Sequence, residues 1–335
     1  MNETKEALLT YFPPELKQVM GNLSEWHFNQ LTEIRLRPSQ PLILKTAQKE
    51  CSINAAGYLT QDLSQGYLID RQSILKVIEL ISGFSMYAFE KQIKNGYLTL
   101  KGGHRVGITG TAVLTEGQWE SQLKTLKTFG SVNIRVARQV HGAADKLITH
   151  MLDDHTPYHT LIVSPPACGK TTMLRDAIRQ LSYGSDDRPG LTIGVVDERQ
   201  EIAASHQGVA QNDLGPRTDV LDSCPKAIGM AMLLRTMSPH VIAVDEIGTP
   251  EDVTAIEQIM NSGVAVVATV HGNSMADVLA KPALSYLVQQ RLFQRYVVLS
   301  SQQLGAIAGV YNQDFQLVSE ASDEPQFTKE VVCFD

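Results

Sequence analysis

Ser164-Pro165-Pro166-Ala167-Cys168-Gly169-Lys170-Thr171 is the segment of this 335-residue sequence that indicates its fold most strongly. It follows a short apolar segment, Thr160 to Val163, and precedes a helical pattern that runs from Thr171 to Leu181. A strand, a turn and a helix in this order form the context in which a phosphate-binding loop works. In such a loop, backbone N–H groups and the helix N-terminus hold phosphate oxygens. The lysine reaches the β and γ phosphates, and the threonine hydroxyl ligates Mg²⁺.

We therefore expect this loop to bind ATP together with Mg²⁺. The loop departs from the full pattern at two places, because Ser164 stands where the first glycine is expected and Ala167 adds a β-carbon where a bare backbone approaches phosphate more easily. The alternative is an ordinary strand-turn-helix that carries Gly-Lys-Thr by chance. The residues predicted to contact the nucleotide are Ser164, Pro165, Pro166, Ala167, Cys168, Gly169, Lys170, Thr171 and Thr172.

A second apolar strand, Val241 to Val244, ends in the acids Asp245 and Glu246. Two acids at a strand end are expected of the second half of an ATPase site. We predict that Asp245, with Thr171, holds the metal and its water shell. Glu246 would orient or deprotonate the attacking water. The alternative is a pair of solvated acids that end a strand, since acidic side chains are usually exposed.

Two further segments end predicted strands near the same site. Val196-Asp197-Glu198-Arg199-Gln200-Glu201 could place Glu198 or Glu201 beside the metal or the water, although strand-end charges are often merely solvated. His271 follows the strand Val264 to Thr269, so it could sense the γ phosphate from the carboxyl end of the sheet. The alternative is that His271 has only a structural role.

A positive side chain is needed to neutralise charge in the transition state, and a neighbouring subunit or domain often supplies it. We rank Arg217 first, with a surface or ion-pair role as the alternative for every candidate. The candidates are Arg105, Arg135, Arg138, Arg217 and Arg235.

The order of strands and helices after Lys146 predicts a parallel sheet, because apolar segments of about five residues alternate with helix-length segments. The remaining expected strand is Leu191 to Val196, and the remaining helices are Pro225 to Met237 and Glu251 to Ser262. Tyr296 to Leu299 and Ala306 to Tyr311 are expected to add edge strands.

We expect residues 1–145 to form a smaller mixed α/β domain, followed by the ATPase domain of residues 146–335. A turn at Arg37-Pro38-Ser39-Gln40-Pro41 leads into the strand Leu42 to Leu44, and a helical pattern follows at Ser73 to Leu80. The segments Gly96 to Leu100 and Arg105 to Ile108 look like strands about the Gly102-Gly103 turn.

Composition limits the function classes. The sequence is 43% hydrophobic and 19% charged with a net charge of -7, which argues against a protein whose main task is to coat nucleic acid. Its four cysteines are far apart and fit neither a disulfide framework nor a zinc site, which favours a reducing, cytoplasmic compartment. The N-terminus lacks the pattern of a secretory signal, and no apolar stretch reaches the roughly 18 residues of a membrane helix. We therefore expect membrane association through partners.

With these residues in view, the chain resembles the stage III sporulation protein AA family, relatives of the ring-forming ATPases of type II and type IV secretion. The resemblance implies a RecA-like ATPase domain, a hexamer, and membrane-protein partners in a secretion-like channel between mother cell and forespore of an endospore-forming bacterium. It also implies that Glu198 and His271 serve the nucleotide site. The segments that carry it are Ser164 to Thr172, Val196 to Arg199, Arg217 to Asp222, Val244 to Gly248, and Gly96-Tyr97 with Gly102 to Gly107.

The leading functional hypothesis is therefore an ATP-hydrolysing motor that acts on a membrane-associated assembly. Two alternatives stay open. A small-molecule kinase would use the same phosphate-binding loop but also needs an acceptor pocket and a lid. A nucleotide-dependent scaffold would need Lys170 and tolerate the loss of Glu246.

Overall fold

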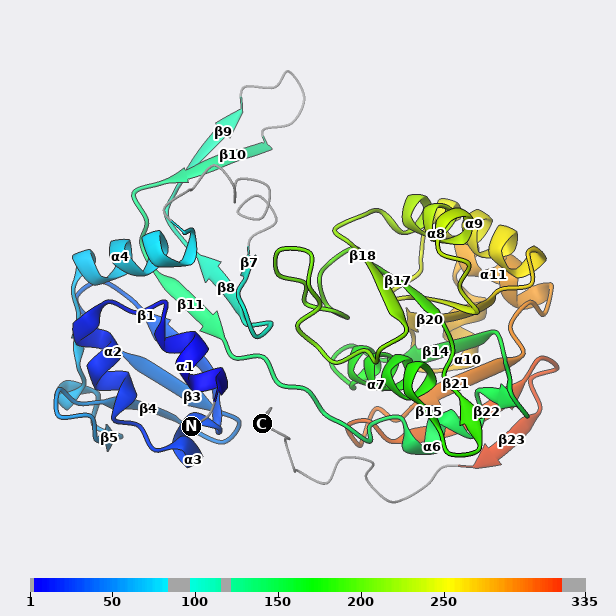
Figure 1. Cartoon of the computed structure of the whole chain (residues 1–335), viewed down its shortest axis with the longest axis horizontal. Coiled ribbons are helices and arrows are strands. Elements are labelled where there is room, and N and C mark those ends of the chain that lie inside the picture. The colour runs from blue at the N-terminus through cyan, green and yellow to red at the C-terminus, as the bar shows by residue number, and fades with distance from the viewer. Residues whose placement is uncertain (1–2, 84–96, 116–121, 321–335) are drawn as a thin grey trace. The chain divides into compact units, whose positions relative to one another are not determined.

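The computed structural model describes residues 3–83, 97–115 and 122–320. The chain divides into two compact units between Arg138 and Gln139 (Figure 1). The domain division expected from sequence, after residue 145, stays a prediction. Among the helices of the described residues, none is long and apolar enough to cross a membrane.

The N-terminal unit contains an antiparallel sheet of seven strands in the order β5-β4-β3-β1-β11-β8-β7. Helices α1, α2 and α4 share one hydrophobic core with this sheet, in which Leu16, Ile34 and Val77 are fully buried. The two strands β9 and β10 form a separate hairpin that stands away from the sheet (Figure 1). The bounds are α1 Glu3–Leu9, α2 Pro14–Gly21, α3 Glu25–Phe28, α4 Arg71–Ile81, β1 Leu31–Leu36, β3 Ile43–Thr46, β4 Glu50–Ile53, β5 Leu59–Thr60, β7 Leu98–Thr99, β8 Arg105–Ile108, β9 Thr111–Thr115, β10 Gln122–Lys127 and β11 Val132–Arg135.

The second unit contains a sheet of eight strands in the order β18-β17-β19-β20-β14-β21-β22-β23. The first six strands of that order are parallel, and β22 and β23 are antiparallel additions. The strand bounds are β14 Thr160–Ser164, β17 Ile193–Asp197, β18 Thr218–Asp222, β19 Val241–Val244, β20 Ala265–His271, β21 Arg295–Leu299, β22 Ile307–Asn312 and β23 Leu317–Glu320. The helix bounds are α6 Asp145–Ile148, α7 Lys170–Tyr183, α8 Lys226–Thr236, α9 Pro250–Asn261, α10 Met275–Leu279 and α11 Pro282–Gln289.

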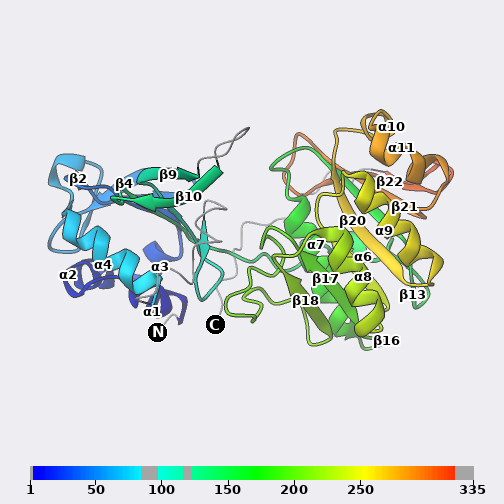
Figure 2. The same ribbon diagram turned by 90° about the horizontal axis from the view of Figure 1, so that it is seen from above.

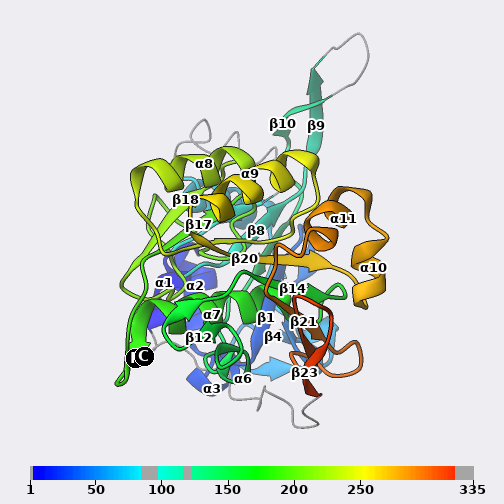
Figure 3. The ribbon, with the colours of Figure 1, turned by 90° about the vertical axis from the view of Figure 1, so that its right-hand side faces the viewer.

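Helices cover both faces of this sheet (Figures 2 and 3). Successive strand side chains point to opposite faces, so Ile162 joins the core beneath α7 while Leu161 and Val163 join the core beneath α8, α9 and α11. The four strands and three helices expected around the phosphate-binding loop are present within a few residues of their predicted bounds.

Two sequence expectations need correction at the margins of the sheet. Neither β21 nor β22 is an edge strand, because β21 pairs with β14 and β22, and β22 pairs with β21 and β23. Within the described part of the chain, β23 forms the edge instead. The opposite edge is β18, which had not been expected as a strand. Its side chains are all only partly buried, so it lacks the apolar run that marks the central strands.

Candidate active site

The carboxyl ends of four parallel strands meet at one edge of the large sheet. Ser164 ends β14, Asp197 ends β17, Asp245 and Glu246 follow β19, and His271 ends β20. Ligand sites on open α/β sheets form at this edge, where the loops leave the strands. The topology therefore brings together the segments that the sequence had singled out.

The phosphate-binding loop is held in place by backbone bonds from two other segments. Gly272 N donates to Ser164 O at 3.1 Å, and Gly305 N donates to Cys168 O at 3.1 Å. Gly169, with φ of 92°, sits in the left-handed region at the N-cap of α7, where glycine carries no steric cost. Ala167 also has a positive φ, 60°, which costs a residue with a β-carbon free energy.

Lys170 and Thr171, the first two residues of α7, contact the two acids that follow β19. Lys170 Nζ lies 2.5 Å from Glu246 Oε1 and 3.7 Å from Asp245 Oδ1. The Thr171 hydroxyl donates to Asp245 Oδ2 at 2.6 Å. The buried Thr269 hydroxyl donates to the other oxygen of Asp245 and accepts from Glu246 N, so β20 fixes both acids against the loop.

Glu246 is the centre of the polar network. Besides Lys170, its carboxylate contacts Arg199 Nη1 at 2.6 Å and His271 Nε2 at 2.8 Å. Burial raises the pKa of Glu246, but the hydrogen bond and charge of Lys170, with the charges of His271 and Arg199, outweigh it and hold that pKa below its ordinary value. Glu246 is therefore ionised at neutral pH.

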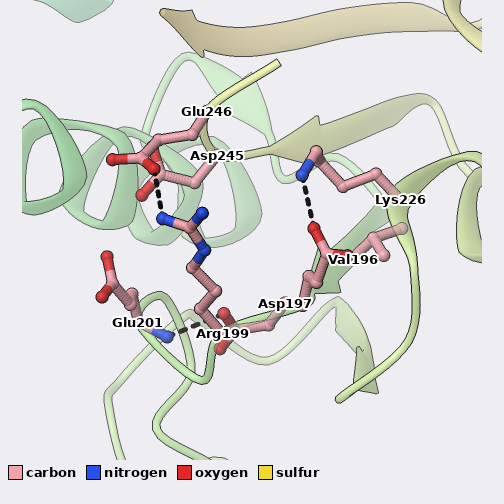
Figure 4. Close-up of a pocket in the computed structure, with 8 residues that line it drawn as sticks. Val196, Asp197, Arg199, Glu201, Lys226, Asp245 and Glu246 are labelled. Carbon is pink, nitrogen blue, oxygen red and sulfur yellow. Dashed lines mark hydrogen bonds and ion pairs between the residues drawn. The ribbon is translucent and has the colours of Figure 1, made fainter. Parts of the chain in front are cut away.

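The acidic segment after β17 supplies the adjoining wall of a pocket (Figure 4). Asp197 is buried and accepts backbone N–H bonds from Glu201, Ile202 and Ala203 at 2.7–3.1 Å, which fixes the loop. Burial raises the pKa of Asp197, and these three hydrogen bonds act in the opposite direction. Glu198, half-exposed, pairs with Lys226 at the start of α8. The pocket is lined by Val196, Asp197, Glu198, Arg199, Glu201, Lys226, Asp245 and Glu246.

Most of the residues predicted for the site share this edge of the sheet. Lys170, Thr171, Asp245, Glu246 and His271 form one contact network, and Thr172 lies in the same first turn of α7. Glu198 lines the adjoining pocket.

Arg217 lies elsewhere, because it precedes β18 at the amino ends of the parallel strands. Its guanidinium donates to Ser182 O at 3.0 Å, near the end of α7. Arg217 therefore does not reach the phosphate-binding loop of its own chain, and a role as a charge-neutralising residue could only be played in a neighbouring subunit.

Five residues that contact or line the site were not predicted from the sequence. These are Val196, Asp197, Arg199, Lys226 and Thr269. Arg199 stands among acids after a strand, which is a usable signal once that segment is placed beside Glu246. Lys226 and Thr269 carry no distinctive local pattern, and only the sheet order brings them in.

Comparison with known proteins places the chain in a family. The family described as "Sporulation stage III, protein AA" matches residues 2–318. The chain is also 36% identical over 323 residues to stage III sporulation protein AA of Bacillus subtilis (strain 168), covering 96% of this chain and 98% of that protein. The chain belongs to the stage III sporulation protein AA family.

Solved structures show which fold this sporulation protein AA family member has. The Yersinia pseudotuberculosis ATPase DotB matches with a TM-score of 0.54 and 15% identity, over 92% of this chain and 78% of that one. The pilus retraction motor PilT, solved with bound ADP, matches with a TM-score of 0.52 and 14% identity, over 81% and 75%. The expected family and the expected fold class, a RecA-like P-loop domain with a smaller mixed α/β domain, are both confirmed.

Proposed function

We propose that this sporulation protein is an ATP-hydrolysing motor that works as a hexamer on a secretion-like channel between mother cell and forespore. It would lie in the cytoplasm, held at the membrane by partner proteins of the channel. One observation carries the ATPase part of the proposal. The first two residues of α7 contact the two acids after β19, so the phosphate-binding loop and the acidic strand end form one site.

The donor set fits a magnesium-bound nucleotide. Thr171 and Asp245 bring a hydroxyl and a carboxylate oxygen together at 2.6 Å, and hard oxygen ligands of this kind suit Mg²⁺. When bound, the metal would neutralise charge on the β and γ phosphate oxygens. Lys170 would bind those same phosphates from the start of α7, in exchange for its present partner Glu246.

Glu246 would then act on the attacking water. It is ionised at neutral pH and its side chain is 20% exposed, so it can accept a hydrogen bond from water and orient it. His271 and Glu198 would support this arrangement, His271 through its contact with Glu246 and Glu198 from the adjoining pocket wall.

The proposal is tested by steady-state release of free phosphate from ATP with Mg²⁺, over a range of protein concentrations. Glu246→Gln should lower the rate about a hundredfold or more, since a positioned acid-base group contributes at least that factor. Lys170→Ala should lower it by about the same factor, because it removes a charge that stabilises the phosphates in the transition state. Glu246→Gln should retain ATP binding. Exposed residues give matched controls, Lys76→Ala and Glu251→Gln, which should keep the wild-type rate.

The alternatives predict other results. A motor that shares its sites between subunits should hydrolyse faster per subunit as concentration rises. ATP binding without phosphate release at any concentration would favour the scaffold. ADP formed without free phosphate, in the presence of a phosphoryl acceptor, would favour the kinase. In an endospore-forming host, a Glu246→Gln strain that sporulates normally without hydrolysis would exclude the motor.

A further inference from the structure

Arg199 is the exposed member of the network around Glu246. Its side chain is 66% exposed, whereas that of Lys170 is 8% exposed. The two cations bind different oxygens of the same carboxylate, Lys170 on Oε1 and Arg199 on Oε2. Figure 4 shows the contact of Arg199 with Glu246. Glu246 therefore separates Lys170, on the side of the phosphate-binding loop, from Arg199, on the side of solvent.

The backbone that carries Arg199 is fixed, while its side chain has room to move. Asp197, two residues earlier, accepts three backbone N–H bonds from residues 201–203, so the loop cannot shift without breaking buried hydrogen bonds. The guanidinium itself lines the pocket beside Glu246. Because its backbone is fixed and its side chain is long and exposed, Arg199 can change partners without rearranging the loop.

The chemistry of the group suits a phosphate partner better than a single carboxylate oxygen. A guanidinium presents several N–H donors in a planar fork that matches two phosphate oxygens at once. A terminal phosphate placed beside Lys170 would lie next to the carboxylate that both cations now share. It would also carry more negative charge than Glu246, so it would compete for the same donors.

We infer that Arg199 binds the terminal phosphate of a bound nucleoside triphosphate in its own subunit, leaving Glu246 as it does so. This inference rests on the proposed function and adds to it a residue that distinguishes ATP from ADP. Arg199 and Lys170 bind the two carboxylate oxygens of Glu246 and restrict the access of water to them. In the filled site, both cations turn to phosphate and Glu246 is released.

Binding of a non-hydrolysable ATP analogue and of ADP, both with Mg²⁺, tests the inference by titration calorimetry on the full chain. Arg199→Ala should weaken analogue binding about tenfold or more, as expected for the loss of a charged hydrogen bond, and change ADP binding less than twofold. Arg199→Lys should recover part of the loss. Arg291→Ala, which removes an exposed arginine paired with Asp314, is the matched control and should change neither affinity.

The rival explanation is that Arg199 only restrains Glu246. Adding Arg199→Ala to Glu246→Gln separates the two explanations. If Arg199 binds phosphate directly, Arg199→Ala still weakens analogue binding in the Glu246→Gln background. If Arg199 only restrains Glu246, the substitution has no further effect there. A vanished effect, or an equal effect on the analogue and ADP, would overturn the inference. So would recovery of analogue binding on mixing Arg199→Ala with Lys170→Ala, since that result would place Arg199 in a neighbouring subunit. A wild type that binds neither nucleotide would instead refute the proposed function itself.

Discussion

Ala167 is the residue at which the phosphate-binding loop carries steric strain. Its φ of 60° lies in the left-handed region, which costs a residue with a β-carbon about 1–2 kcal/mol. Glycine avoids that cost but loses about 0.5–1 kcal/mol through the freedom of the unfolded chain. We predict that Ala167→Gly raises the free energy of unfolding by about 0.5–1 kcal/mol, as measured by urea denaturation.

An alanine-to-glycine substitution at a position with ordinary helical φ should instead lower the free energy of unfolding. Ala255 lies inside α9 and is buried, so Ala255→Gly should lower the free energy of unfolding by about 1 kcal/mol. Equal destabilisation by both changes would show that the loop carries no strain at Ala167.

Glu246 gives the site a dependence of stability on pH. Its pKa is lower in the folded protein than its ordinary value of 4.5, so its contribution to stability is present above that value and is lost as the pH falls through the folded pKa. Glu246→Gln leaves Lys170, which is 7% exposed, without its nearest counter-charge. We predict a loss of about 1–2 kcal/mol at pH 7 that shrinks as the pH falls below about 4.5.

Unfolding of wild type and variant by urea at pH 7, 5 and 4 measures this difference. Glu251→Gln, an exposed change in the first turn of α9, is the control. A penalty that stays constant or grows towards pH 4 would contradict the ion pairs at Glu246 as the source.

The residues of the site could be predicted where a strand and its acids stand together in the sequence. Lys170, Thr171, Asp245 and Glu246 follow from such local patterns. Arg199 could not be chosen over five other arginines, because its importance comes from its distance to Glu246, which depends on β17 and β19 being neighbours. Arg217 was preferred from its surroundings in the sequence, which do not show that its strand starts at the far end of the sheet.

Among the helices and strands, the close approach of α8 to β17 depends on Gly229. A β-carbon at this position would lie 2.5 Å from Val196 Cγ1 and 3.2 Å from Leu221 Cδ2. Alanine favours the helix by about 1 kcal/mol over glycine, but crowding a packed core costs about 1–3 kcal/mol, and a β-branched valine has few ways to move aside. We predict that Gly229→Ala lowers the free energy of unfolding by about 1–2 kcal/mol.

A second substitution identifies the cause. Val196→Ala removes the methyl groups that the new side chain would meet, so the double variant should be more stable than the sum of the single effects predicts. Gly248→Ala is the control, since nothing lies within 4 Å of the added β-carbon. Because α8 begins at Lys226, the Gly229→Ala variant should also disturb the pair with Glu198.

The central elements could be predicted because their sequences are buried on both sides. β14, β17, β19 and β20 are short apolar runs, and only a parallel sheet covered by helices buries such runs completely. The margins could not be predicted in this way. β18 is partly exposed along its length, and the position of β22 inside the sheet depends on its pairing with β23, which is mostly exposed and has no strong pattern.

Along the chain as a whole, each compact unit has hydrophobic cores of its own. The core of the N-terminal unit uses residues 8–134, and the two cores of the second unit use residues 144–310 and 161–298. All contacts of the phosphate-binding loop described above belong to the second unit. Nucleotide binding should therefore stabilise the second unit directly and leave the stability of the N-terminal unit unchanged.

The two tryptophans make this separation measurable. Trp26 lies in α3 of the N-terminal unit, whereas Trp119 lies outside the described residues. In a Trp119→Phe background, tryptophan fluorescence therefore follows the N-terminal unit while circular dichroism follows both units. A ligand that binds only folded protein stabilises it by about 2.7 kcal/mol at one hundred times its dissociation constant. We predict that an ATP analogue with Mg²⁺ raises the midpoint of an unfolding transition seen by circular dichroism. The midpoint of the transition seen by fluorescence should stay unchanged.

Lys170→Ala should abolish the nucleotide-dependent shift without moving the fluorescence transition, because the lysine lies in the second unit and contacts the acids of the site. Lys76→Ala, an exposed change in the N-terminal unit, should leave the shift intact. If nucleotide raised both transitions together, unfolding of the two units would be coupled. That result would contradict the separate hydrophobic cores as the main source of stability of each unit.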